Sequence, residues 1–361
     1  MSADASFEAS TTAQGLIYVS GVVARPAARS GDIGTQVKDV LDQIDARLKA
    51  QGSSLARAVS LQVQLRQASD FAAMNVAYAP LFATADAPAR TTIVAPPETP
   101  GALVEISAIA AAAGATREIV RPSGWAAAAN PYSYGVRSGD LVFLAGLVSR
   151  NGRTGEVVAG DLAAQAGVIF SNATDILAAA GLTLADVVNA KVFVTDAGLV
   201  APMNDAYRAR MPAPRPSRAT AIAALMNPQY QVEMTFIAAA GKTIVNRPGA
   251  PAQPDATLAQ GVTVGQRVFV SGMLGADFKA SVEDQTRSVV ERLTAMLTAA
   301  GFDWSHVVDA TLYVTDPAHA EPARKTMRTA IGRELPAGAT LVTGLVVGDA
   351  DVEIMVSAAR R

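Results

Sequence analysis

The sequence repeats one pattern three times, and this repeat constrains the fold more than any other feature. Each copy begins with an apolar segment that ends in a glycine, at residues 16–21, 141–146 and 267–272. A helical pattern then opens on a glutamine and closes, 16 residues later, on a glycine, which is typical of a helix C-terminus. The paired residues are Gln36 and Gly52, Gln165 and Gly181, and Gln285 and Gly301. The repeat predicts one structural unit present in three copies.

Each copy then continues with a strand, a second helix and two further strands. The first of these strands, at residues 55–65 in the first copy, alternates β-branched and polar residues. Stretches that contain Pro and Gly lie near residues 114–124 and 241–254 and are natural joints between copies. The expected modules therefore span residues 1–115, 116–241 and 242–361.

The order of elements predicts an α+β module with a mixed sheet and two helices on one face. Two helices cover only one face of such a sheet, so the other face needs a partner. Three copies in one chain supply it if their sheets face inward around a pseudo-threefold axis. We therefore expect a single-chain pseudo-trimer. Three independent domains on a string are the alternative, and the short joints argue against it.

Composition narrows the classes of function. The net charge is −2 and no basic run would follow a phosphate backbone, so we expect no nucleic-acid partner. The chain has no cysteine, which excludes disulfides, thiolate nucleophiles and sulfur-ligated metals. The two histidines, His306 and His319, lack acidic partners at ligand spacing, so we expect neither a metal site nor a Ser-His-Asp triad.

The N-terminal residues have no apolar core of the kind found in signal peptides. We expect no stretch to reach the roughly 20 apolar residues of a membrane span. These two expectations predict a cytoplasmic protein without a membrane partner.

Two copies share a specific set of polar residues. Residues 88–92 read PARTT and are followed by Glu105, and residues 216–220 read PSRAT and are followed by Glu233, so that Arg and Glu are 15 residues apart in both. Both copies also contain Met-Asn-x-x-Tyr, beginning at Met74 in the first. With these residues the chain resembles the RidA/YjgF family of reactive intermediate deaminases, which have a chorismate-mutase-like fold and are usually homotrimers.

The resemblance implies that clefts between neighbouring modules bind a small 2-imino or 2-keto acid. Arg90 and Arg218 would hold the substrate carboxylate, since a guanidinium binds a carboxylate through two parallel hydrogen bonds. Glu105 and Glu233 would help a water molecule to add to the imine. No cofactor or metal is implied. The further pocket residues carried over from the family are Ser20, Gly21, Asn75, Tyr132, Gly146, Asn204, Ser271 and Gly272.

Purely structural roles for these residues remain open as alternatives. Each Arg could pair with the Glu of its own module across adjacent strands. The two Asn residues could hold local backbone, and Tyr132 could be a packing residue only.

The third copy departs from the family pattern. Gly338 stands where the Arg belongs, Leu258 where the aromatic residue belongs and Arg324 where the Asn belongs, although Glu353 is kept. We therefore expect at most two clefts to bind a carboxylate in the family's way, and we expect Glu353 to be structural. Arg324 could reach into the defective cleft from another direction, but a surface position is favoured. In the other copies, Ala145 replaces the Ser and Phe7 stands where the family often has Tyr.

The sequence thus predicts a hydrolase that deaminates a small imine, enamine or related compound bearing a carboxylate. One alternative is a pathway enzyme with a single remaining cleft for a different substrate, and another is a binding protein for 2-keto acids without turnover. Ribonuclease activity, which the family resemblance also brings in, has little support from the charge distribution. We expect a monomeric pseudo-trimer, and a higher assembly remains open.

Overall fold

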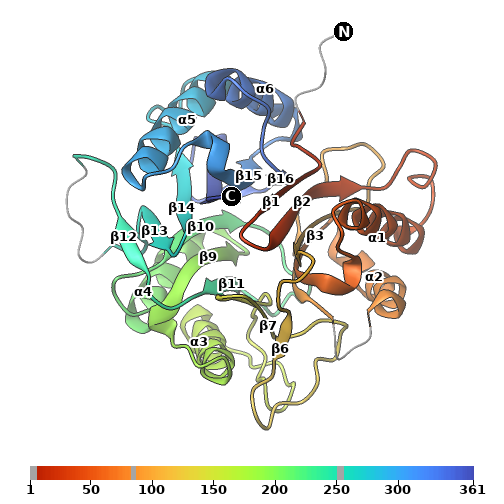
Figure 1. Ribbon diagram of the computed structural model, residues 1–361. Coiled ribbons are helices and arrows are strands. Elements are labelled where there is room, and N and C mark those ends of the chain that lie inside the picture. The colour runs from red at the N-terminus through yellow and green to blue at the C-terminus, as the bar shows by residue number, and fades with distance from the viewer. Residues whose placement is uncertain (1–5, 83–86, 250–255) are drawn as a thin grey trace.

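The computed structural model describes residues 6–82, 87–249 and 256–361. Three sheets surround a common centre, and the helices lie on the outside of this ring (Figure 1). This arrangement confirms the expected α+β fold with three repeated units. Residues 250–254 of the second expected joint lie outside the described residues.

The first module forms a five-stranded sheet in the order β1-β2-β5-β3-β4. Only the pair β3 and β4 is parallel, because α2 connects them as a crossover. The elements are β1 (Ser10–Ala13), β2 (Leu16–Val23), α1 (Ile33–Lys49), β3 (Ala58–Leu65), α2 (Phe71–Tyr78), β4 (Ala89–Val94) and β5 (Val104–Ala111).

The second module repeats this layout and adds an N-terminal strand, so that its own strands follow the order β10-β9-β11-β8-β7-β6. The elements are β6 (Glu118–Val120), β7 (Gly135–Ser138), β8 (Leu141–Leu144), α3 (Leu162–Ala179), β9 (Val187–Val194), α4 (Val200–Arg210), β10 (Ser217–Ile222) and β11 (Val232–Ala238).

The third module has the order β12-β13-β14-β18-β15-β16 and lends a further strand, β17, to the sheet of the second module. The elements are β12 (Thr243–Val245), β13 (Gly261–Val264), β14 (Arg267–Leu274), α5 (Val282–Ala299), β15 (Val307–Val314), α6 (Ala320–Ile331), β16 (Gly338–Val342), β17 (Gly344–Leu345) and β18 (Val352–Ala359).

Helix α1 shows why the predicted helical segments form. Asp32 caps its N-terminus by accepting a hydrogen bond from the backbone N–H of Thr35. Val37, Val40, Leu41, Ile44 and Leu48 recur at helical spacing, and all are buried against the sheet.

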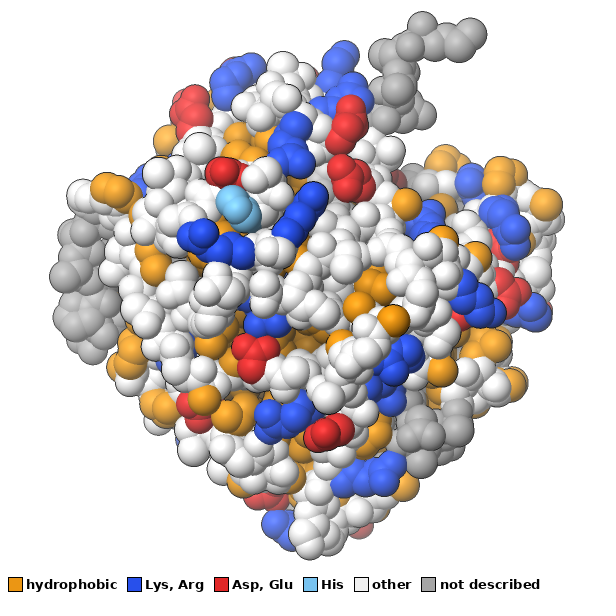
Figure 2. Space-filling model, viewed as in Figure 1, with side chains coloured by type: hydrophobic (Ala, Val, Ile, Leu, Met, Phe, Trp, Pro, Cys, Tyr) orange, Lys and Arg blue, Asp and Glu red, His pale blue; other side chains and the backbone are white. Residues whose placement is uncertain are grey.

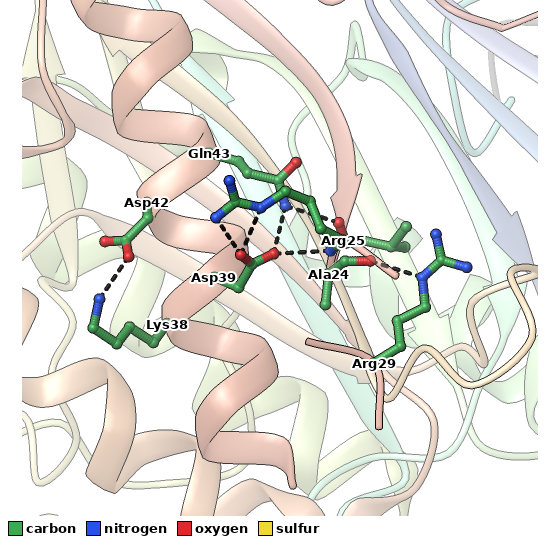
Figure 3. A network of polar contacts seen from close by, with 8 residues as sticks. Ala24, Arg25, Arg29, Lys38, Asp39, Asp42 and Gln43 are labelled. Carbon is green, nitrogen blue, oxygen red and sulfur yellow. Dashed lines mark hydrogen bonds and ion pairs between the residues drawn. The ribbon is translucent and has the colours of Figure 1, made fainter. Parts of the chain in front are cut away.

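Polar contacts fasten α1 to the chain that leaves β2 (Figure 3). Arg25 donates from Nε to Oδ1 of Asp39 at 2.7 Å, and its backbone N–H donates to Oδ2 of the same carboxylate at 2.8 Å. Gln43 donates to the carbonyl of Val23 at 3.1 Å. The positive charge of Arg25 is therefore neutralised within the first module.

Helix α3 corrects one expectation. Its 18 residues are long and apolar enough to cross a membrane by length and composition, although the sequence was expected to hold no such stretch. Half of this helix is buried, and its apolar residues, including Ile169, Phe170 and Ile176, pack in the core of the second module. The apolar composition of α3 therefore serves core packing.

The inner faces of the three sheets bury one another. Tyr18, Phe143 and Phe269 occupy equivalent places in β2, β8 and β14 and belong to one buried cluster. Nearby, Lys191 of β9 donates hydrogen bonds to Gln62 of β3 and Thr311 of β15, both at 3.1 Å. The sheet face that the helices leave uncovered is thus covered by the other modules, as the repeat predicts.

Candidate functional site

Neighbouring modules meet at three equivalent junctions, which we call the first, second and third clefts. In the first cleft, the backbone N–H of Gly146 donates to the carbonyl of Arg90 at 3.1 Å. In the second, the backbone N–H of Arg218 donates to Oγ of Ser271 at 2.8 Å, and in the third that of Gly338 donates to Oγ of Ser20 at 3.0 Å. Each cleft therefore joins the Arg-bearing strand of one module, or its equivalent, to the Gly-bearing strand of the next.

The first cleft combines an Arg and a Glu from different modules. Arg90 on β4 and Glu233 on β11 line one cavity of about 320 Å³, together with Tyr132 and Gly146. Pairing of Arg90 with its own module's Glu105 across adjacent strands does not occur, because β3 lies between β4 and β5.

Arg90 is buried beneath aromatic rings. Its guanidinium carbon lies 4.8 Å from the ring centre of Tyr78, 5.7 Å from that of Tyr132 and 5.8 Å from that of Phe71. Burial lowers the pKa of Arg90 from its ordinary value. Among the described residues, no carboxylate lies within ion-pair distance of this guanidinium. A buried positive charge is unfavourable unless it is paired, so an anion in this cleft would stabilise the guanidinium of Arg90.

Arg218 occupies the same position in the second cleft but has different neighbours. Its guanidinium lies 4.7 Å from the ring centre of Tyr207, and its Nη2 donates to Oδ1 of Asn204 at 2.6 Å. Asn75, the counterpart of Asn204, instead donates to the carbonyl of Phe71 in its own helix at 2.9 Å. Only one of the two predicted Asn residues therefore touches an Arg.

The three glutamates are buried, and their pKa values are shifted in the same direction. Burial raises the pKa of Glu105, Glu233 and Glu353 to about 8 in each case. A hydrogen bond from the backbone of Thr92 and the charge of Arg90 act in the opposite direction on Glu233, and Arg218 does so on Glu353. A carboxyl group with such a pKa can both donate and accept a proton near neutral pH.

Glycine is required next to each glutamate. A methyl group added at Gly21, Gly146 or Gly272 would lie 1.9 Å, 1.9 Å or 1.7 Å from Oε1 of Glu105, Glu233 or Glu353, respectively. These contacts are shorter than any nonbonded pair of heavy atoms tolerates. The glycines therefore leave space for the carboxyl groups.

The predicted serines act on the backbone between modules. Ser271 accepts from the N–H of Arg218 and donates to the carbonyl of Ala259 at 2.5 Å, and Ser20 accepts from the N–H of Gly338. Ala145 has no hydroxyl group and makes no such bridge in the first cleft.

The third cleft contains its own carboxylate. Nη1 of Arg324 lies 2.7 Å from Oε1 of Glu98 and donates to Oγ1 of Thr340 at 3.0 Å. The side chain of Arg324 is 13% exposed, so the expected surface position is wrong and the residue reaches into the cleft. Glu98 belongs to the first module, far from Arg324 in the sequence, which is why no local pattern revealed the pair.

Phe7 fills the place of the missing Arg. A methyl group added at Gly338 would lie 2.8 Å from Cδ1 and Cε1 of the Phe7 ring. A longer side chain at position 338 would therefore collide with Phe7.

Sequence reasoning missed several residues of the first cleft. Arg150 and Tyr230 line its cavity. Neither residue recurs at the equivalent position of all three copies, so the repeat did not mark them as site residues. The remaining lining residues that it missed are Phe71, Thr92, Asn130, Val148, Met226, Asn227 and Pro228. In the parts of the chain that the structure describes, no three His, Asp or Glu side chains gather in a way that could hold a metal ion.

Comparison with known proteins gives one consistent family. The family described as Endoribonuclease L-PSP matches residues 1–112, 124–240 and 249–360. A RutC family protein of Pyrococcus horikoshii is 32% identical over 108 residues, which cover 30% of this chain and 86% of that protein. A 2-iminobutanoate/2-iminopropanoate deaminase of Dermatophagoides farinae is 31% identical over 107 residues, covering 30% of this chain and 84% of the deaminase. Among solved structures, the YjgF gene product of Escherichia coli is 32% identical, with a TM-score of 0.32, over 34% of this chain and 99% of that one.

Proposed function

This chain belongs to the Endoribonuclease L-PSP family, with three tandem copies of the family's module, and from that premise we propose that it hydrolyses a small imine or enamine bearing a carboxylate. Similarity to proteins named as deaminases supports deaminase-like chemistry in general. The observation that carries the proposal is Arg90, a buried guanidinium that forms no ion pair with any described carboxylate, in a cavity that also contains Glu233 of the neighbouring module.

In the proposed reaction, Arg90 binds the substrate carboxylate and places the imine carbon beside Glu233. The protonated Glu233 donates a proton to the imine nitrogen, and the resulting carboxylate accepts a proton from the water molecule that adds to the carbon. The same carboxyl group then returns that proton to the amino group, which leaves as ammonia. As the C–N bond breaks and the carbonyl forms, the hydroxyl group gives its proton to the carboxylate, so that Glu233 is again protonated. The pKa of about 8 suits this exchange, since both protonation states are accessible near neutral pH.

The proposal assigns activity to the first two clefts. Arg324 in the third cleft is already paired with Glu98, and Phe7 takes the space beside Gly338. A substrate carboxylate would have to displace an internal carboxylate there, so we assign no turnover to the third cleft.

Two alternatives follow because the first and second clefts differ in the residues that line them. The first cleft has Ala145 in place of the bridging Ser, and the second has Leu258 in place of Tyr132. One cleft alone could therefore act on a specialised substrate, or both could bind 2-keto acids without turnover. Basic and acidic side chains are interspersed over the visible face in Figure 2, which favours a small substrate over a nucleic acid.

The test uses imines formed in situ by an amino-acid oxidase, with release of keto acid followed in buffer and with protein. We expect accelerated release, a partial loss in Arg90→Ala and in Arg218→Ala, and loss to the buffer rate in the double variant. Loss in only one single variant would support one specialised cleft. No acceleration with any imine, combined with calorimetric binding of 2-keto acids, would support the binding protein instead.

A further inference from the structure

The first cleft contains a second cationic side chain. Arg150 lines the same cavity as Arg90, and the two guanidinium groups act electrostatically on the same ring, that of Tyr132. The cavity of about 320 Å³ thus presents two positive charges at different places on its wall.

The guanidinium of Arg150 contacts the protein backbone, and none of the described carboxylates forms an ion pair with it. Its Nη1 donates to the backbone carbonyl of Gly155, and the backbone of Arg150 forms an isolated bridge with Val157. Within the described ranges, no Asp or Glu forms an ion pair with Arg150. The loop therefore holds the side chain in place and leaves its charge available.

The equivalent positions in the other modules behave differently. Arg25 lies four residues after Gly21, as Arg150 lies four residues after Gly146, but Arg25 is paired with Asp39 on α1 (Figure 3). The second module has Val168 where the first has Asp39. In the third module, Ala276 takes the place of Arg150, so the second cleft lacks this cation.

We propose that the first cleft is specific for a 2-imino acid with a second acidic group on its side chain, and that Arg150 binds this distal carboxylate while Arg90 binds the one beside the imine. The proposal rests on the proposed function and names its substrate class. A guanidinium recognises a carboxylate through charge-assisted hydrogen bonds, which a neutral substrate side chain does not offer to Arg150. The second cleft, with Ala276, would take substrates with neutral side chains.

The test isolates the first cleft with Arg218→Ala and compares imines formed in situ from glutamate and from leucine. We expect kcat/KM for the glutamate-derived imine to exceed that for the leucine-derived one about tenfold or more. Arg150→Gln should lower kcat/KM for the dicarboxylate about 10- to 100-fold, mainly through KM, and change the value for the neutral substrate by no more than about twofold. Arg150→Lys should keep part of the preference because it keeps the charge.

Arg25→Gln is the matched control, since it removes an Arg from the equivalent position of another module and should leave both values unchanged. If the protein hydrolyses the neutral imine but Arg150→Gln does not change kcat/KM for the dicarboxylate, this inference is overturned. The proposed function would still stand. Calorimetry with 2-oxoglutarate tests the case in which the site binds a dicarboxylate but the protein hydrolyses no imine. Binding that depends on Arg150, without hydrolysis of any imine, would support the site and contradict the proposed function.

Discussion

Arg324 of the third module and Glu98 of the first form an ion pair of 2.7 Å inside the cleft where these modules meet. At the position of Arg324 the first cleft has Asn75 and the second has Asn204, and at the position of Glu98 the first has Met226 and the second has Val346. The two replacements are therefore complementary. The third cleft is thus filled by an internal ion pair, whereas Arg90 and Arg218 in the other two are buried and form no ion pair with a carboxylate among the described residues.

We expect Glu98→Gln to destabilise the protein by about 1–3 kcal/mol, because the largely buried Arg324 would lose the ion pair that it forms with Glu98 at 2.7 Å. Urea unfolding at neutral pH measures the change. Glu334→Gln is the control, since Glu334 is exposed and lies 3.7 Å from Arg328, and it should cost less than about 1 kcal/mol. If both variants lower the free energy of unfolding equally, the ion pair in the cleft stabilises the protein no more than an exposed pair does.

Gly146→Ala should inactivate the first cleft while the chain still folds. The added methyl group would lie 1.9 Å from Oε1 of Glu233 and would force that carboxyl group away from its position. In an Arg218→Ala background we expect turnover to fall by about tenfold or more, as for a misplaced acid-base group. Gly348→Ala is the control, because nothing lies within 4 Å of the added methyl group. Unchanged turnover in Gly146→Ala would argue against a role for Glu233.

The buried glutamates should make the protein less stable at alkaline pH. Each keeps its proton in the folded state up to a pH of about 8, whereas an unfolded Glu loses it near its ordinary pKa of about 4.3. The folded state therefore binds more protons between these values, and the free energy of unfolding from this source falls as pH rises through that window. Each carboxyl group contributes a slope of up to about 1.4 kcal/mol per pH unit.

Urea unfolding at pH 5 and at pH 9 measures this dependence. Glu353→Gln keeps the shape of the side chain and removes the titration, so the difference between the two pH values should shrink. A difference as large as in the wild type would mean that Glu353 has an ordinary pKa in the folded protein.

Lys191→Met should destabilise the centre of the ring. Lys191 and Asp309 line the same cavity. Burial lowers the pKa of Lys191 and raises the pKa of Asp309. The charge of each residue acts against the pKa shift of the other. Removal of the Lys leaves the Asp charge uncompensated, which should cost about 3 kcal/mol. Adding Asp309→Asn should restore part of the loss. A double-mutant cycle by urea unfolding measures the coupling, and additive effects would contradict it.

Much of the fold and part of the candidate site could be predicted from the repeat. The helices α1 (Ile33–Lys49), α3 (Leu162–Ala179) and α5 (Val282–Ala299) lie within three residues of the segments that periodicity predicts. The strands beside them and the inward face of each sheet also follow from local periodicity. Arg90, Arg218, Glu105 and Glu233 were predicted as site residues because the same spacing of Arg and Glu recurs in two copies, and that role stays a prediction. The membrane-like composition of α3 was missed, since a buried helix and a membrane span look alike by hydropathy.

The sequence by itself determined that three similar modules exist and which polar residues each one carries, because helix and strand patterns are set by neighbours a few residues apart. Only the tertiary structure decided which module supplies which half of a cleft. The partnership of Arg90 with Glu233, the pairing of Arg324 with Glu98 and the presence of Arg150 and Arg90 in one cavity each depend on segments that are distant in the chain. Such contacts arise when the ring closes and leave no periodic signal in any one copy.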